Sequence, residues 1–345
     1  MSLIKTLLAV SVAACLLPGV ASAAKILTYT DHEPLGGMRT QFIKDVFFPA
    51  IEKESHGRLK VEAHWNGELS TSYNALKTVA AGKNVDMAIV VPEYTPDVFP
   101  LQQIFKSFPV GPVGDKQIEF FRRVYADVPA FPEELQKANV VNLFFATGYP
   151  VAFFSTKPLK TLDDIKGTKW RTASFWHQDF LKNAGAIPVS MPWNDGIYKA
   201  LEAGTLDGLM VNVDSGYQLK VHKTAPDILV SKDLWLGHVY LLVMNKQTWD
   251  GLAKEDREAI SRAAEIAYQS LGAVMDKSMG SQIEELKKEG ASVRVLKKDE
   301  VMKWQAATRY QEVQASWVKE QEAKGVKAAG ATMDKVTHIM NDTMK

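Results

Sequence analysis

Short apolar runs alternate with helix-like patterns over the first two thirds of this chain, and that alternation limits the possible folds more than any other feature. In the first unit the pattern predicts strands at residues 25–30, 58–65 and 85–91 and helices at residues 38–54 and 75–81. The run at 85–91 is apolar except for Asp86, which is typical of a buried strand in a parallel sheet. Because helices between such strands must cover the faces of the sheet, the sequence predicts an α/β fold.

The middle of the chain repeats this pattern, and the last third is mostly helical. Strands are predicted at residues 140–146, 151–155, 168–171, 208–211, 234–244 and 292–295, and helices at residues 161–164, 175–183, 196–203, 255–288 and 301–317. Thr161 and Asp164 have the spacing of a capping box, and Gly167 and Gly290 stand where C-terminal caps are expected. No flexible linker separates the two α/β regions, so we expect strands to connect them.

The first 23 residues have the organisation of a secretory signal peptide. Lys5 supplies the positive charge, residues 7–17 form the apolar core, and Ala21-Ser22-Ala23 is an A-x-A cleavage site. The apolar core is too short for a spanning helix, and no later window offers about 18 apolar residues in a row. We therefore expect export to the periplasm and a mature chain that no helix anchors in the membrane.

Cys15 allows one alternative for the N-terminus. The segment Val12-Ala13-Ala14-Cys15 resembles a lipoprotein processing box, which would leave a lipidated Cys15 as the first residue. The apolar stretch and the A-x-A site that follow it favour the cleavable signal peptide. Cys15 is the only cysteine, so cleavage of the signal peptide would exclude disulfides, thiolate metal sites and cysteine nucleophiles.

Charge and motif content argue against several function classes. The chain has 41 basic and 40 acidic residues, and loss of Lys5 with the signal peptide brings the mature chain close to neutrality. This balance argues against nucleic acid or an anionic membrane surface as a partner. The seven histidines lack metal-ligand spacing, and the chain has no G-x-S-x-G elbow, phosphate loop or dinucleotide fingerprint. We expect a binding protein rather than an enzyme, with no cofactor and no metal.

One continuous stretch carries a specific family resemblance. Residues 163–211 read DDIKGTKWRTASFWHQDFLKNAGAIPVSMPWNDGIYKALEAGTLDGLMV. The positions that match a family pattern are Lys166-Gly167, Lys169-Trp170-Arg171, Gly185-Ala186, Pro188, Met191-Pro192, Tyr198, Ala200-Leu201, Gly204 and Asp207-Gly208. The stretch resembles the DctP-like solute-binding subunits of tripartite ATP-independent periplasmic (TRAP) transporters, and weaker matches extend over nearly all of the mature chain.

The resemblance implies a two-lobed periplasmic-binding-protein fold of the type II-like, Venus-flytrap kind, with hinge strands and a long helix spanning both lobes. We expect lobe 1 to comprise residues 24–148 and 236–275, and lobe 2 to comprise residues 149–235 and 276–345 with the C-terminal helices. The resemblance also implies a small organic-acid ligand and, as partners, the small and large membrane permease subunits. Most relatives act as monomers, so a monomer is expected, although an amphipathic C-terminal helix would also suit a dimer.

Arg171 is the residue that the resemblance marks most clearly. In the family, the arginine of a K-x-R motif pairs with the substrate carboxylate, and Arg171 occupies that position. A planar guanidinium offers two parallel donors and stays charged when buried, which suits a carboxylate. The alternative role is a salt bridge at the surface or between helices, and the surrounding motif favours the binding role.

The other candidates follow from strand ends and from the family cleft. They are His32 after the first strand, Tyr73 at a helix start, Glu93 and Tyr94 after the 85–91 strand, Trp176 soon after Arg171, Trp193 in place of a family aromatic, and Asn212 or Asp214 in place of a family amide. Each aromatic has ordinary core packing as its alternative role. His238 is expected to be structural.

Two departures from the family pattern affect the expected ligand. Val151 stands where some relatives have a second arginine, and residues 207–212 read DGLMVN where many relatives read D-G-x-E-N-P. The sequence thus favours a monocarboxylate, such as a keto, hydroxy or aromatic acid, over a dicarboxylate or a sialic-acid-like ligand. Two rival functions stay open: the binding component of an ATP-driven importer or of a membrane sensor, and an exported hydrolase or isomerase.

Overall fold

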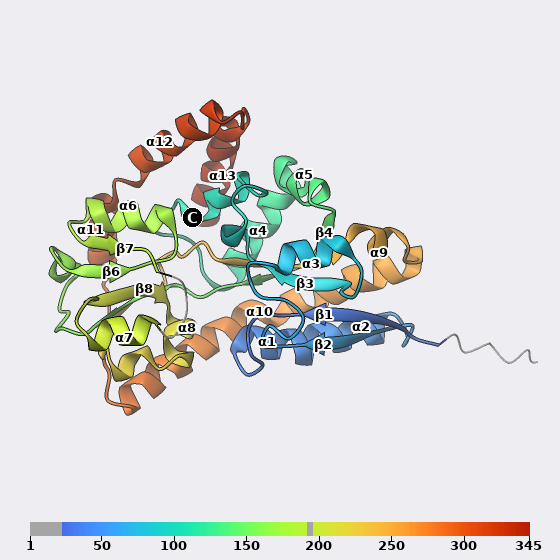
Figure 1. Cartoon of the computed structure of the whole chain (residues 1–345), viewed down its shortest axis with the longest axis horizontal. Helices are drawn as coiled ribbons and strands as arrows, with labels where there is room; N and C mark the ends of the chain where they lie inside the picture. The colour runs from blue at the N-terminus through green and yellow to red at the C-terminus, as the bar shows by residue number, and fades with distance from the viewer. Residues whose placement is uncertain (1–22, 192–195) are drawn as a thin grey trace, which may run out of the picture.

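The computed structural model describes residues 23–191 and 196–345 (Figure 1). The predicted signal segment, up to residue 22 and including Cys15, lies outside these ranges. Across the described ranges no helix combines the length and the apolar content that a membrane span requires. The described strands form two sheets covered by helices, so the predicted α/β class is confirmed.

The first sheet has the strand order β2-β1-β3-β10-β4. Its strands are β1 (Lys25–Thr30), β2 (Leu59–His64), β3 (Met87–Val90), β4 (Val140–Thr147) and β10 (Val239–Asn245). β1 is parallel to β2 and β3, whereas β10 is antiparallel to β3 and β4. β3 is buried on both faces, because Met87 and Ile89 join one core cluster while Ala88 and Val90 join another.

Helical segments connect the strands of the first sheet. They are α1 (Met38–Phe42), the π-helical η1 (Ile43–Phe47), α2 (Phe48–Glu54), α3 (Ala75–Ala81), the 3-10 turns η2 (Pro92–Tyr94) and η3 (Leu101–Lys106), α4 (Gly114–Asp127) and α5 (Ala130–Lys137). The short helix α9 (Lys246–Asp250) follows β10. Gly82 ends α3 with a φ of 60°, and a Cβ placed there would lie 2.7 Å from Nδ2 of Asn245. Both the left-handed backbone and the close approach therefore require glycine at this position.

The second sheet has the strand order β11-β9-β5-β8-β6-β7. Its strands are β5 (Val151–Ser155), β6 (Lys169–Arg171), β7 (Ile187–Val189), β8 (Gly208–Asn212), β9 (Asp227–Val230) and β11 (Ser292–Val295). The helical segments between them are η4 (Leu162–Ile165), α6 (Phe175–Asn183), α7 (Gly196–Glu202), α8 (Val213–Gln218) and η5 (Val221–Lys223). β6 is parallel to β7 and β8, and the predicted capping box of Thr161 and Asp164 is present.

The chain crosses between the two sheets through two short connections. Residues 148–150 join β4 to β5, and residues 231–238 join β9 to β10. α10 (Lys254–Lys288) contacts α2 and α4 beside the first sheet and α8 and β11 beside the second, so it spans both lobes (Figure 1). This is the two-lobed binding-protein fold with a long spanning helix that the sequence resemblance implies.

The C-terminal helices depart from the sequence prediction in two ways. The single helix predicted over residues 301–317 is broken into α11 (Lys298–Thr308) and α12 (Tyr310–Ala323), because Arg309 takes a left-handed φ of 50° that ends a helix. The last helix, α13 (Ala329–Thr343), packs against α4 and η3 of the first lobe, whereas the sequence assigned residues 276–345 to the second lobe. Val336 and Met340 of α13 share a core cluster with Ile104 and Phe105 of η3, which explains this placement.

Candidate functional site

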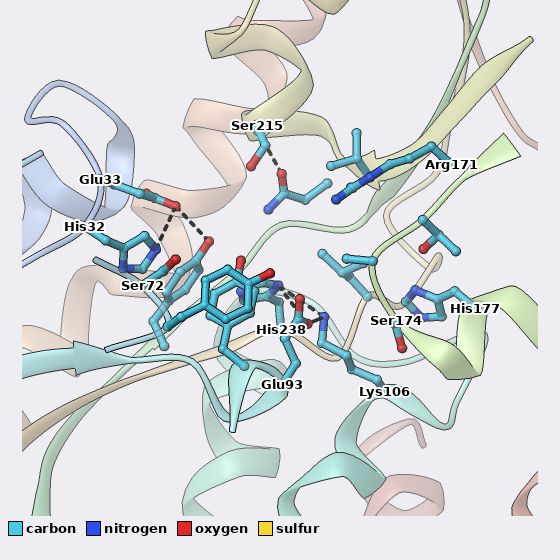
Figure 2. A pocket seen from close by; sticks show the side chains of 18 of the residues that line it. His32, Glu33, Ser72, Glu93, Lys106, Arg171, Ser174, His177, Ser215 and His238 are labelled. Atoms are coloured by element: carbon cyan, nitrogen blue, oxygen red, sulfur yellow. Dashed lines mark hydrogen bonds and ion pairs between the residues drawn. The ribbon is translucent and has the colours of Figure 1, made fainter. Parts of the chain in front are cut away.

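A cavity of about 440 Å³ lies between the two lobes. Its walls on the first lobe come from the loops after β1 and β2, from η2 and η3, and from the start of β10. On the second lobe they come from the end of β6, the start of α6, the end of β8 and the start of α8 (Figure 2). Several of these segments follow the carboxyl ends of strands, where ligand sites of α/β proteins collect.

Arg171 reaches the cavity from the end of β6. Its Nε and Nη2 donate hydrogen bonds of 3.1 and 2.8 Å to the backbone carbonyl oxygen of Met191. The side chain is buried, and burial holds the pKa of Arg171 below its ordinary value while the nearby Glu93 opposes that shift. An arginine keeps its charge under such a shift, so the wall carries a buried, oriented guanidinium.

Asn212 and Asp214, the two alternatives for the family amide, lie in different surroundings. Asn212 lines the cavity and caps α8, because its side-chain oxygen accepts a hydrogen bond from the backbone N–H of Ser215 at 2.8 Å. Asp214 is directed to α10 instead, where its carboxylate accepts a hydrogen bond of 2.7 Å from Gln282. Burial raises the pKa of Asp214 from 3.8 to about 6. The cavity lining thus contains Asn212 but not Asp214.

Three predicted residues of the first lobe form an aromatic part of the cavity wall. Tyr73 and Tyr94 have ring centroids 4.8 Å apart, and the ring of His32 lies edge-on to that of Tyr94 at 6.4 Å. Tyr73 is 61% exposed, so its ring is open to solvent at the mouth of the cavity. Burial lowers the pKa of His32, which favours the neutral imidazole.

Behind this wall lies an ion pair that the sequence analysis did not find. Arg39 of α1 binds both carboxylate oxygens of Asp31, with its Nη1 2.6 Å from Oδ2 and its Nη2 2.9 Å from Oδ1. The same guanidinium contacts Glu33 at 2.8 Å and lies 4.2 Å above the ring of Tyr240. Burial alone would raise the pKa of Asp31, but the charge and hydrogen bonds of Arg39 bring it below 3.8. Glu33 and Tyr240 are thereby fixed in the cavity wall.

The floor of the cavity contains a second cluster of charged and polar groups. Glu93 forms an ion pair with Lys106, a residue that sequence reasoning missed. Nζ of Lys106 also lies 3.3 Å from Nδ1 of His238, which lines the cavity. Burial lowers the pKa of His238 well below its usual range, and the pKa of His177 falls to about 3 for the same reason. Both histidines are therefore neutral at physiological pH.

Of the two predicted tryptophans, Trp176 is described by the structure and is not among the residues that line this cavity. Trp176 is fully buried, and its Nε1 donates a hydrogen bond of 2.9 Å to the carbonyl oxygen of Gln103 across the lobes. Its ring packs 5.3 Å from that of Trp317. Trp193 lies outside the described residues. In the described part of the chain, no group of three or more His, Cys, Asp and Glu side chains is arranged to hold a metal ion.

The family model described as "Bacterial extracellular solute-binding protein, family 7" matches residues 39–320 of the chain. Among curated proteins, the C4-dicarboxylate-binding periplasmic protein DctP of Rhodobacter capsulatus is 26% identical over 231 residues. That match covers 63% of this chain and 64% of the relative, so it spans less than two thirds of the relative's length.

Solved structures with the same fold include two TRAP solute-binding proteins. One comes from a marine metagenome, is specific for aromatic acid ligands and was co-crystallised with 3-hydroxybenzoate. It has a TM-score of 0.80 at 21% sequence identity, and the match covers 94% of this chain and 100% of that protein's chain. The other, from Haemophilus influenzae RdAW with bound L-gulonate, has a TM-score of 0.76 at 17% identity and covers 91% and 99%. At these identities the likeness establishes the fold.

Proposed function

Since this chain belongs to family 7 of the bacterial extracellular solute-binding proteins, the DctP-like binding subunits of TRAP transporters, we propose that it captures a small organic acid through a carboxylate bound by Arg171. The acid is held between the lobes and passed to a membrane permease with one small and one large subunit. The mature protein works in the periplasm as a monomer after removal of residues 1–23.

The orientation of Arg171 is the observation that carries this proposal. Met191 accepts hydrogen bonds from two nitrogens of the guanidinium, which fixes its plane at the cavity wall. A carboxylate that reaches this buried cation makes charge-assisted hydrogen bonds, each contributing about 1.5–3 kcal/mol net. Asn212, Tyr94 and Tyr73 line the same cavity and would set shape and hydrogen bonding around the bound acid.

Closure of the lobes gives the bound state a distinct shape for the permease to recognise. The connections at 148–150 and 231–238 are short, so a movement of one lobe relative to the other would concentrate there. A ligand that contacts both lobes stabilises the closed arrangement by its differential affinity for that state. We therefore expect Arg171 of the second lobe and the tyrosines of the first lobe to contact the same molecule.

A thermal-shift screen of the mature protein, stripped of ligand by partial unfolding, tests this function against a panel of organic acids. An acid at about a thousand times its dissociation constant stabilises the folded state by about 4 kcal/mol. The shift should be lost in Arg171→Met and kept in Arg294→Met, a control that removes a part-buried arginine of the second sheet paired with Glu300. An equal response of Arg171→Met and wild type would assign Arg171 a structural role.

The rival functions have separate tests. Chemical turnover of a bound acid, abolished by a change in the cavity, would point to an exported enzyme. Transport into vesicles that carry an ATP-driven permease, rather than one driven by an ion gradient, would point to the other class of importer.

A further inference from the structure

Besides Glu93, the cavity floor contains four polar side chains that are each more than nine-tenths buried. The exposed fractions are 7% for Lys106, 6% for Ser174, 1% for His177 and 8% for His238. All four line the cavity, and Figure 2 shows Lys106, Ser174 and His177 together on the side of the cavity away from His32 and Glu33. They come from η3, from the start of α6 and from the connection that precedes β10.

This floor carries no net positive charge. The ammonium group of Lys106 is paired with the carboxylate of Glu93, and His238 beside it is neutral. A second carboxylate of a ligand would therefore meet Glu93 without a counter-charge and would lose its hydration. The floor thus selects against a dicarboxylate bound between Arg171 and Lys106.

The floor does offer hydrogen-bonding atoms of both kinds. Lys106 has only donors, so Nδ1 of His238 accepts from it and Nε2 of His238 carries the ring proton. Four buried atoms of the floor have no hydrogen-bond partner among the described residues: Nε2 of His238, both ring nitrogens of His177 and Oγ of Ser174. A neutral His177 offers one donor and one acceptor, and a serine hydroxyl offers both.

Hydroxyl groups match this arrangement of unpartnered donors and acceptors. Each of these atoms is buried away from solvent, so a ligand hydroxyl that reaches it would supply the hydrogen bond that it lacks. A hydroxyl donates and accepts at once, whereas an aromatic ring would leave the buried atoms unpaired. A chain of hydroxyl-bearing carbons offers several such groups to the donors and acceptors of the floor.

Resting on the proposed capture of a carboxylate by Arg171, we propose that Lys106, Ser174, His177 and His238 form a subsite for hydroxyl groups. The ligand is then a polyhydroxylated monocarboxylate, an acid of the aldonate or uronate class. Its carboxylate lies at Arg171 and its distal hydroxyls lie on the cavity floor.

Isothermal titration calorimetry of the stripped mature protein tests the subsite with D-gluconate, D-galacturonate, benzoate and succinate, and with D-galactose as the uncharged comparison. At least one of the two sugar acids should bind about tenfold or more tightly than benzoate and succinate. Ser174→Ala and His177→Phe should each weaken that sugar acid by about 3- to 10-fold and leave any binding of benzoate unchanged. Thr343→Val, which removes a buried hydroxyl of α13 outside the cavity lining, should have no effect.

The outcomes separate this inference from the function on which it rests. Three results would overturn the hydroxyl subsite and leave carboxylate capture intact. Benzoate or succinate could bind more tightly than both sugar acids, Ser174→Ala and His177→Phe could weaken benzoate and the sugar acid equally, or neither sugar acid could bind. Binding of D-galactose as tight as that of D-galacturonate, together with no effect of Arg171→Met, would overturn the carboxylate-binding function itself. Thermal unfolding of each variant verifies that it is folded.

Discussion

The guanidinium of Arg171 donates two hydrogen bonds to a single acceptor, the carbonyl oxygen of Met191. These bonds fix the plane of the side chain, so its shape matters as well as its charge. Arg171→Lys keeps a cation but loses the planar fork and the bonds that orient it. We predict that Arg171→Lys weakens binding of the acid selected by the panel by about 10- to 100-fold, nearly as much as Arg171→Met. Calorimetric affinities close to wild type in Arg171→Lys would show that charge alone suffices.

The pair of Asp31 and Arg39 should stabilise the first lobe. Arg39→Met leaves the fully buried carboxylate of Asp31 without its cation, and such a loss costs about 3–5 kcal/mol. Denaturant unfolding should report this loss as a lower midpoint. The double change Asp31→Asn with Arg39→Met should recover part of it, because no buried charge is left unpaired. Exposed ion pairs contribute only about 0–1 kcal/mol to the free energy of unfolding. If Arg39→Met lowers that free energy by no more than such an exposed pair would, the pair has no special role in stability.

Asp214 should make the protein less stable as pH rises. Its pKa is raised by burial from 3.8 to about 6, so between these values the folded state holds more protons than the unfolded state. The stabilisation is complete below pH 3.8 and is lost as pH rises through about 6. Asp214→Asn removes this dependence and can still accept the hydrogen bond from Gln282. We predict that Asp214→Asn is more stable than wild type by about 1–3 kcal/mol at pH 7.5 and not at pH 4, by denaturant unfolding at both pH values.

Asp163 provides the matched control for that measurement. It is an exposed aspartate of the second lobe whose pKa is lowered by Lys166 rather than raised by burial. Asp163→Asn should therefore not gain stability at pH 7.5. The same gain in both variants would mean that the effect of Asp214→Asn reflects general charge and not the burial of this carboxylate.

Local patterns predicted several elements of both lobes, including β6, which carries Arg171. The bounds of β1, α3 and α6 coincide with the predicted ranges, because each has clear periodicity and an obvious start or stop. β7 and β9 were not predicted, since strands of three and four residues give too few positions for a period to appear. The break at Arg309 was also missed, because the apolar spacing continues across it.

The cavity floor shows which part of a site sequence reasoning does not reach. Lys106 and His238 are 132 residues apart, and only the tertiary fold brings their nitrogens to 3.3 Å. The one available signal was a lysine within the mainly apolar segment 99–110, where a buried charge requires a partner. Asp214 shows the opposite case, because it is only two residues from Asn212 along the chain and yet its side chain faces α10 instead of the cavity.

Calorimetry with an acid and its primary amide tests carboxylate capture most directly. The acid is the member of the panel that gives the largest thermal shift, and its amide has nearly the same shape without the charge. We predict that the wild-type protein binds the acid about 100-fold more tightly than the amide, and that Arg171→Met binds the two with similar, weak affinity. Equal affinity of the wild-type protein for acid and amide would contradict the assignment of Arg171 as the carboxylate-binding residue.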